Sequence, residues 1–170
     1  MAEERPNLLG LSRDKMKALF SELGEKPFRA QQIMQWLHQR GELELNAMTD
    51  ISKSLRGQLE QSVDIRLPKI VADYSSDDGS HKWVIEVASG SRVEMVFIPE
   101  GGRGTLCVSS QAGCSLDCSF CATGKQGFNS NLTVAEIVGQ VWLARQQLGG
   151  FEQGAERKVS NVVMMGMGEP

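Results

Sequence analysis

The chain is poor in cysteine, histidine and tyrosine, and it has no long apolar run. Of its 170 residues, four are Cys, two are His and one is Tyr. Three of the four cysteines lie within eight residues, which argues against a disulfide scaffold and for a reducing cytoplasm. No apolar run approaches the ~18 residues needed to cross a bilayer, and the acidic N-terminus is unlike a secretory signal. We therefore expect a folded cytoplasmic protein with no membrane partner.

A strong positive charge is also missing. The formal net charge is −3, with 41% hydrophobic and 23% charged residues. A dedicated nucleic-acid binder usually carries a basic patch, and the totals do not indicate one. Residues 11–69 hold ten Lys/Arg against eight Asp/Glu, a small basic excess. Any nucleic-acid partner must therefore be inferred from other features.

The first part of the chain has helical periodicity, and we expect a helical domain over 1–66. Ser12 is a candidate N-cap for a helix that ends at Gly24. Two more amphipathic segments follow, 27–41 and 48–61, and core packing of a small helical unit is the simplest interpretation of their apolar stripes.

From Leu67 the apolar period changes to two, which predicts a β extension over 67–99. A turn-forming stretch, Ser-Ser-Asp-Asp-Gly-Ser, predicts a hairpin between its first two strands. The Gly-rich segment 99–104 predicts a flexible break before a third domain, 100–170. The predicted strands are 69–74, 82–87 and 92–98.

Residues 100–170 have a strand–helix–strand pattern, which indicates an α/β fold. A short strand is expected at 105–110. A capping box, Thr133 to Glu136, opens a helix that Gly149 and Gly150 end. Residues 159–165 then have the composition of a fully buried strand. Together these segments predict a βαβ unit with parallel strands and a right-handed crossover.

The cysteine cluster, Cys114, Cys118 and Cys121, has CxxxCxxC spacing. Three thiolates are one too few for a closed tetrahedral zinc site. They suit a [4Fe-4S] cluster in which one iron stays open to a ligand. A zinc site with Cys107 as the fourth ligand is the alternative, but Cys107 lies within a predicted strand rather than on a knuckle.

A second unusual segment, Gly166-Met-Gly168-Glu169, follows the second strand of the βαβ unit. Ligands of parallel sheets bind beyond the carboxyl ends of the strands, where this segment and the cysteine loop should meet. The glycines allow close approach to a ligand, and Glu169 offers a carboxylate to an amino group. An open iron beside such a site suggests S-adenosylmethionine. A plain exit from the strand is the alternative interpretation of 166–170.

These motifs resemble the RlmN family of radical S-adenosylmethionine enzymes, which methylate adenine C2 in 23S ribosomal RNA and transfer RNA. The CxxxCxxC spacing, with aromatic Phe120 before the third cysteine, is typical of the superfamily. The resemblance covers essentially the whole chain. Its matching segments are 26–33, 92–99, 105–111, 120–128 and 166–170.

The resemblance implies a role for each candidate residue. Cys114, Cys118 and Cys121 would bind the cluster, and Gly168 and Glu169 would hold S-adenosylmethionine. Glu94 would be the general base that deprotonates the adenine adduct, and Cys107 would resolve the covalent intermediate with RNA, leaving a transient disulfide. From the residues alone, a solvated strand carboxylate is the default interpretation of Glu94, and a buried small side chain is the alternative for Cys107.

The family also implies a fold, partners and one departure. It implies a partial (β/α)6 barrel, RNA recognition by the helical domain, an electron donor such as flavodoxin, and a monomer. Its methyl-carrying cysteine, however, lies in a C-terminal half, and no Cys follows Cys121 here. We therefore expect a fragment that cannot complete methyl transfer alone. The alternatives are the related C8-methylating resistance enzyme and a non-catalytic cluster- or metal-binding module.

Overall fold

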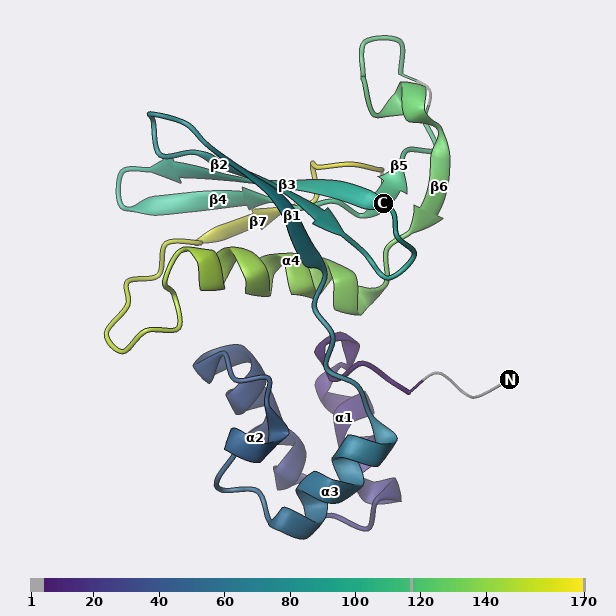
Figure 1. The fold of residues 1–170 in the computed structure, drawn as a ribbon, viewed down its shortest axis with the longest axis vertical. Coiled ribbons are helices and arrows are strands. Elements are labelled where there is room, and N and C mark those ends of the chain that lie inside the picture. Colours follow the sequence, from purple (N-terminus) through teal and green to yellow (C-terminus); the bar gives the residue numbers. More distant parts are fainter. Residues whose placement is uncertain (1–4, 117, 170) are drawn as a thin grey trace. The chain divides into compact units, whose positions relative to one another are not determined.

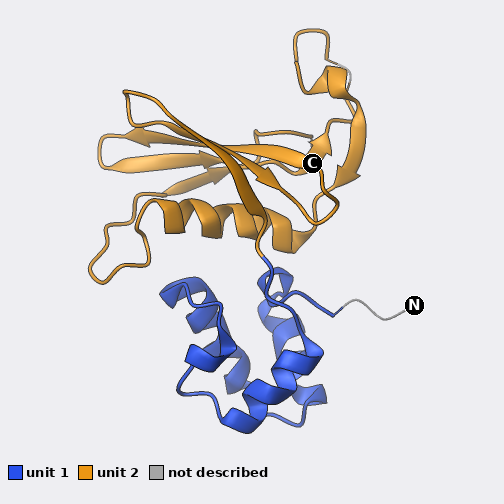
Figure 2. Cartoon of the chain, viewed as in Figure 1, with its two compact units in different colours: residues 1–66 blue, residues 67–170 orange. Residues whose placement is uncertain are grey.

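The computed structural model describes residues 5–116 and 118–169. The chain divides into two compact units, Met1–Arg66 and Leu67–Pro170, shown in different colours in Figure 2. Each unit is described by itself. None of the helices in the described ranges is long and apolar enough to span a membrane.

The first unit is helical, as its periodicity predicts. Ser12 caps its first helix by accepting a hydrogen bond from the Lys15 N–H, and Ser52 caps the third in the same way. Gly41 ends the second helical segment in the left-handed conformation, with φ of 68°. The helices are α1 (Arg13–Glu22), α2 (Phe28–Gln35), which continues as a π-helical turn (Trp36–Arg40), and α3 (Lys53–Ser62), with 3-10 turns at Leu8–Gly10 and Leu45–Ala47.

The core of this unit comes from apolar side chains on all three helices and on the segments between them. Phe20, Ile33 and Leu59 are fully buried. The predicted single segment 48–61 is shorter than expected, because Met48 and Ile51 lie before the Ser52 cap. Both are nevertheless buried, which explains why their spacing resembled a continuation of the helix.

The second unit is a five-stranded sheet with one long helix along it (Figure 1). The first three pairings are antiparallel and the last, β4 with β7, is parallel. Helix α4 (Val134–Gln147) connects those two parallel strands and begins at the predicted Thr133–Glu136 capping box. The strand order is β1-β2-β3-β4-β7, with bounds β1 (Lys69–Ser75), β2 (His81–Glu86), β3 (Arg92–Glu100), β4 (Arg103–Cys107) and β7 (Asn161–Val163).

The two faces of the sheet have different environments. Along the central strands, buried apolar side chains alternate with partly exposed ones. The buried set lies on one face of the sheet, and helix α4 runs along the sheet (Figure 1). The opposite side, called the open face below, carries Glu94, Val96 and Cys107, which are all partly exposed. The buried set is Trp83, Ile85, Val93, Met95, Phe97 and Leu106.

The sequence did not predict the small hairpin that carries the cysteines. Strands β5 (Gln111–Gly113) and β6 (Phe128–Asn131) pair antiparallel and form a separate two-stranded sheet. The strand predicted over 105–110 ends earlier, at Cys107, and the chain turns into β5 instead. Figure 1 shows the cysteine segment looping out between β5 and β6.

The prediction of a fully buried strand at 159–165 is wrong. Strand β7 covers only Asn161–Val163, and Val162 is 47% exposed, while Met165, beyond the strand, is 78% exposed. Because β7 lies at the edge of the five-stranded sheet, only β4 pairs with it among the described residues.

The Gly-rich segment at 99–104 is a tight turn rather than a flexible break. Strands β3 and β4 form a hairpin there, with Glu100 paired to Arg103. Gly101 and Gly102 at its tip have φ of 48° and 85°. The sheet therefore runs without interruption from the β extension into β4.

Candidate active site

The cysteine loop is held at its base by the β5–β6 hairpin. The Cys114 N–H donates to the Gly127 carbonyl at 3.1 Å, and the Cys121 N–H donates to the Cys118 carbonyl at 3.0 Å. Gly113 has φ of 77°, and a Cβ there would lie 1.9 Å from the Gly127 carbonyl oxygen. Because any side chain would collide with that oxygen, only glycine fits at position 113. The close approach of the two strands at the base of the loop therefore depends on Gly113.

The donor set of this loop suits an iron–sulfur cluster. All three thiols are free and partly exposed. The backbone N–H groups of Gly124 and Thr123 lower the pKa of Cys121 below its ordinary value, which favours the thiolate that binds iron. A hollow of about 310 Å³ adjoins Cys114 and Lys125. Within residues 5–116 and 118–169, no three His, Cys, Asp or Glu side chains are gathered closely enough to hold a metal ion, so the thiols would have to turn towards a cluster to bind it.

The segment 166–169 lies directly against the chain between β4 and β5. The Gly166 N–H donates to the Val108 carbonyl at 3.0 Å. The Met167 carbonyl accepts from the N–H groups of Ser110 and Gln111, at 2.9 and 3.1 Å. The segment 166–169 therefore lies beside residues 108–111, which lead into the cysteine loop, and its predicted meeting with the cysteines themselves stays a prediction.

The two glycines of this segment are required by the contact itself. A Cβ on Gly166 would lie 2.7 Å from Ser109 Oγ, and one on Gly168 would lie 2.5 Å from Gln111 Cβ. Gly168 also has φ of 96°. Both glycines thus permit close approach to another part of the chain. Glu169 is exposed and its carboxylate stays available to a ligand, while Pro170 lies outside the described residues.

Glu94 lies on the open face of the sheet, as its alternation with buried neighbours predicts. Its Oε1 lies 3.4 Å from the Lys82 Nζ on the neighbouring strand β2. Lys82 Nζ in turn lies 5.4 Å from the centre of the Tyr74 ring. Because both side chains of the ion pair are almost half exposed, at 44% and 47%, the carboxylate is accessible from solvent.

Cys107 shares the open face with Glu94. It pairs with Val96 of β3 and with Val163 of β7, and Val96 is two residues beyond Glu94. Such diagonal neighbours lie on the order of 7–8 Å apart, a distance that one substrate group can bridge. The alternative in which Cys107 is simply a buried small residue does not hold, because its side chain is partly exposed.

Three polar residues that join these groups were missed from sequence. Ser109, Gln111 and Gln140 are buried, at 0%, 7% and 0% exposure. Lys82, the partner of Glu94, was missed as well. One sequence feature could have indicated two of them. The polar run Ser109-Ser-Gln111 comes directly after an apolar strand, where a buried segment is expected. Composition alone could not identify the partners of these side chains.

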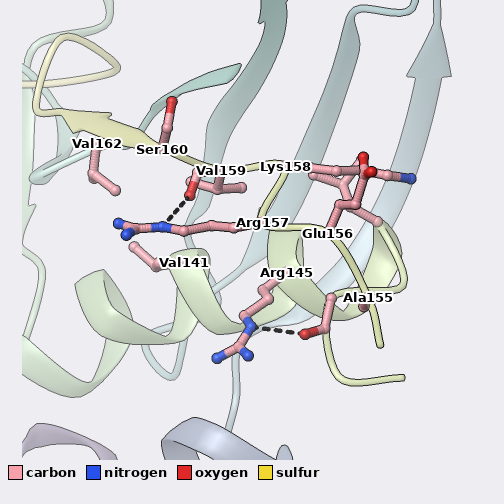
Figure 3. A pocket seen from close by; sticks show the side chains of 11 residues that line it. Val141, Arg145, Ala155, Glu156, Arg157, Lys158, Val159, Ser160 and Val162 are labelled. Carbon is pink, nitrogen blue, oxygen red and sulfur yellow. Dashed lines mark hydrogen bonds between the residues drawn. The ribbon is translucent and has the colours of Figure 1, made fainter. Parts of the chain in front are cut away.

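A larger hollow, of about 390 Å³, lies elsewhere in the same unit (Figure 3). It is formed by the end of α4, the segment 148–160 and the start of β7, which places it at the amino end of that strand. Arg157 Nε donates to the Val159 carbonyl and Arg145 Nε to the Gly150 carbonyl. These arginines hold the surrounding loop together, and none of the predicted site residues lines this hollow.

The chain matches a family model and several curated proteins. Residues 6–65 match the Ribosomal RNA large subunit methyltransferase N-terminal domain. The chain is 57% identical over 166 residues to the dual-specificity RNA methyltransferase RlmN of Pseudomonas fluorescens, covering 98% of this chain and 44% of that protein. It is 58% identical over 169 residues to the RlmN of Marinobacter nauticus, covering 99% of this chain and 46% of that protein.

A solved structure agrees with these matches. A radical SAM methyltransferase from Sphaerobacter thermophilus superposes with a TM-score of 0.85 at 35% identity, covering 97% of this chain and 48% of that one. The chain thus has a mixed α/β fold similar to that enzyme and spans less than half the length of each of these relatives. Over nearly its whole length, this chain is therefore similar to RlmN proteins, and its residues 6–65 match the N-terminal domain of ribosomal RNA large subunit methyltransferases.

Proposed function

We propose that this chain forms the cluster- and S-adenosylmethionine-binding part of a radical RNA methyltransferase that modifies adenine C2. One observation carries the proposal beyond this similarity. The backbone of Met167 is hydrogen-bonded to Ser110 and Gln111, shortly before the cysteine loop. A cofactor held by Gly168 and Glu169 would therefore lie beside a cluster held by the cysteine loop.

The residues divide the chemistry between them. Cys114, Cys118 and Cys121 would hold a [4Fe-4S] cluster, and Gly168 with Glu169 would bind the methionine part of S-adenosylmethionine. When both are bound, the cluster and S-adenosylmethionine would supply a 5′-deoxyadenosyl radical. Polar chemistry cannot provide this reactivity at adenine C2.

The open face would then serve the later steps. The Glu94 carboxylate would accept a proton from the adenine adduct. The Cys107 thiolate would attack the sulfur that links the methyl-carrying cysteine to the adenine adduct, so that an S–S bond forms as the carbon–sulfur bond breaks and the freed carbon takes a proton to become the product's methyl group. Their shared face and partial exposure support both roles.

The finer architecture and the partners belong to the same proposal. Strand β4, helix α4 and strand β7 would begin a partial (β/α)6 barrel. Residues 1–66 would be an RNA-recognition domain, 67–99 a β extension and 100–170 the start of the barrel. The substrates would be 23S ribosomal RNA and transfer RNA, the electron donor a flavodoxin, and the enzyme a cytoplasmic monomer.

Anaerobic reconstitution of the 170-residue chain with iron and sulfide tests the proposal. We expect about four irons per chain, the electron paramagnetic resonance signal of a reduced [4Fe-4S] cluster, and cleavage of S-adenosylmethionine to 5′-deoxyadenosine. Cys121→Ser should abolish cluster binding. Cys107→Ser is the matched control and should retain the cluster and the cleavage.

Other results would favour the alternatives. Zinc binding that Cys107→Ser abolishes would indicate a four-cysteine metal site. A cluster that binds but never cleaves S-adenosylmethionine would indicate a non-catalytic module. The C8-methylating alternative is tested in the chain joined to the remainder of an RlmN protein, by identifying which adenine carbon of a defined RNA gains the methyl group.

A further inference from the structure

A buried hydroxyl group connects three segments of the candidate active site. Ser109 Oγ donates to the Glu94 carbonyl at 2.6 Å and accepts from the Met167 N–H at 2.8 Å. Ser109 itself is fully buried. One oxygen atom thus joins the backbone at the proposed base to the segment proposed to hold S-adenosylmethionine.

The backbone of Ser109 is itself held from the helix. Its N–H donates to Gln140 Oε1 at 2.8 Å, and its carbonyl accepts from Gln140 Nε2 at 2.9 Å. Gln140 lies on α4 and is fully buried. A buried network in which each of these groups is paired is rigid, because breaking any bond leaves a desolvated group without a partner.

Gln111 extends the same connection to the cysteine hairpin. Its Oε1 accepts from the Glu169 N–H at 3.3 Å, and its Nε2 donates to Asn131 Oδ1 at 3.0 Å. Asn131 is the last residue of β6, the strand that returns from the cysteine loop. The side chains of Ser109 and Gln111, two residues apart, therefore accept hydrogen bonds from the N–H groups of Met167 and Glu169, which are also two residues apart.

We propose that Ser109 and Gln111 are positioning residues that fix the S-adenosylmethionine segment, 166–169, relative to the cysteine loop and Glu94. This inference rests on the proposed function. The contact leaves little freedom, since a Cβ at Gly166 or Gly168 would already collide with the Ser109 or Gln111 side chain. Small displacements of a positioned group weaken ligand binding strongly, so loss of either hydrogen bond should appear in cofactor affinity.

The neighbouring serine provides a matched control. Ser110 is 6% exposed, and its Oγ has no hydrogen-bond partner in the part of the chain that the structure describes. Ser109→Ala and Ser110→Ala therefore each remove one buried hydroxyl oxygen, one residue apart. Only the first removes a connection to Met167 and Glu94.

The experiment compares the reconstituted 170-residue chain with both variants. Equilibrium dialysis gives the affinity for S-adenosylmethionine, and electron paramagnetic resonance of the reduced cluster reports its binding at iron. We expect Ser109→Ala to weaken binding about tenfold at unchanged iron content, and Ser110→Ala to stay within about twofold. In the cofactor-free chain, the Met167 amide should exchange faster in Ser109→Ala alone.

The outcomes separate this inference from the proposed function. A wild-type chain that assembles no cluster or binds no S-adenosylmethionine overturns the proposed function and this inference with it. A wild-type chain that binds, beside a Ser109→Ala chain of equal affinity, overturns this inference alone, even if amide exchange changes.

If the Ser109→Ala chain does not fold, the Gln111→Met variant tests the inference instead. Methionine is similar in length, but its thioether is only a weak acceptor for the Glu169 N–H and cannot donate to Asn131. Weaker S-adenosylmethionine binding at unchanged iron content supports the inference, and unchanged affinity overturns it.

Discussion

At the residue scale, Cys121 is the thiol whose environment departs most clearly from that of a free cysteine. Backbone N–H groups of Gly124 and Thr123 point to its sulfur and lower its pKa. A lower pKa means that more thiolate, the reactive and metal-binding form, is present at a given pH. The loop therefore prepares at least one of its ligands for metal binding before a cluster arrives.

We predict that alkylation of Cys121 will report this shift. In the reduced, cofactor-free chain, the rate with iodoacetamide should rise with pH around a midpoint below that of the same thiol in the urea-unfolded chain. Mass spectrometry of the modified peptide measures both rates. Identical midpoints in the folded and unfolded chains would show that the backbone N–H groups do not favour the thiolate.

The second prediction at this scale concerns Gly168. We expect Gly168→Ala to destabilise the second unit by roughly 3 kcal/mol, since the new Cβ adds a collision with Gln111 to an unfavourable φ of 96°. Gly154→Ala is the control, because Gly154 also has a positive φ, 79°, but no atom of the described residues lies within 4 Å of its Cβ position. It should cost about 1 kcal/mol. Urea unfolding compares the two, and equal losses would exclude the contact as the reason for glycine.

At the scale of elements, the π-helical turn Trp36–Arg40 contains a histidine that should make the first unit pH-sensitive. Burial lowers the pKa of His38 below its ordinary value of 6.5. The folded state then binds a proton less readily than the unfolded state. Stability is complete above the unfolded pKa and is lost as the pH falls through and below it.

We predict that the unfolding free energy of the first unit falls as the pH drops below about 7, and that His38→Gln reduces this fall. Hydrogen exchange of buried amides such as those of Ile33 and Leu59 follows the unit separately from the sheet. An equal pH dependence in the variant would assign the effect to other groups.

Local signals predicted most elements, and each error has a physical cause. Caps such as Ser12 and Thr133 were identified correctly because a cap interacts within three residues of itself. The β5–β6 hairpin was missed because its cysteine-containing connection is long and lacks the alternation of a strand. The fully buried strand at 159–165 was wrong because burial of an apolar segment depends on neighbours far away in the sequence.

At the scale of the whole molecule, the two units separate recognition from chemistry in our proposal. The helical unit matches the Ribosomal RNA large subunit methyltransferase N-terminal domain over 6–65, and the sheet unit contains every candidate site residue. The sheet unit also exposes apolar side chains next to the site, among them Phe120 at 91% and Met165 at 78%. Such side chains near a ligand site are available for contact with a bound substrate or with further protein.

We predict that the reconstituted 170-residue chain cleaves S-adenosylmethionine but forms no 2-methyladenosine in a defined RNA. The reason is chemical, because the chain holds four cysteines and none follows Cys121 to carry the methyl group. Nucleoside analysis by mass spectrometry provides the measurement, with a longer RlmN protein as the positive control. Formation of 2-methyladenosine by this chain would disprove the need for a second catalytic cysteine.

The amino-acid order was sufficient for the helices, their caps, the βαβ pattern and the cysteine triplet, because each depends on residues a few positions apart. It also predicted that the cysteine loop and the segment 166–169 follow the carboxyl ends of two parallel strands, since parallel strands end together. It could not show that Ser109 accepts the Met167 N–H, 58 residues away, or that Lys82 pairs with Glu94. Those contacts arise only when distant strands align, and the same alignment determines which glycines are needed and which strand remains exposed.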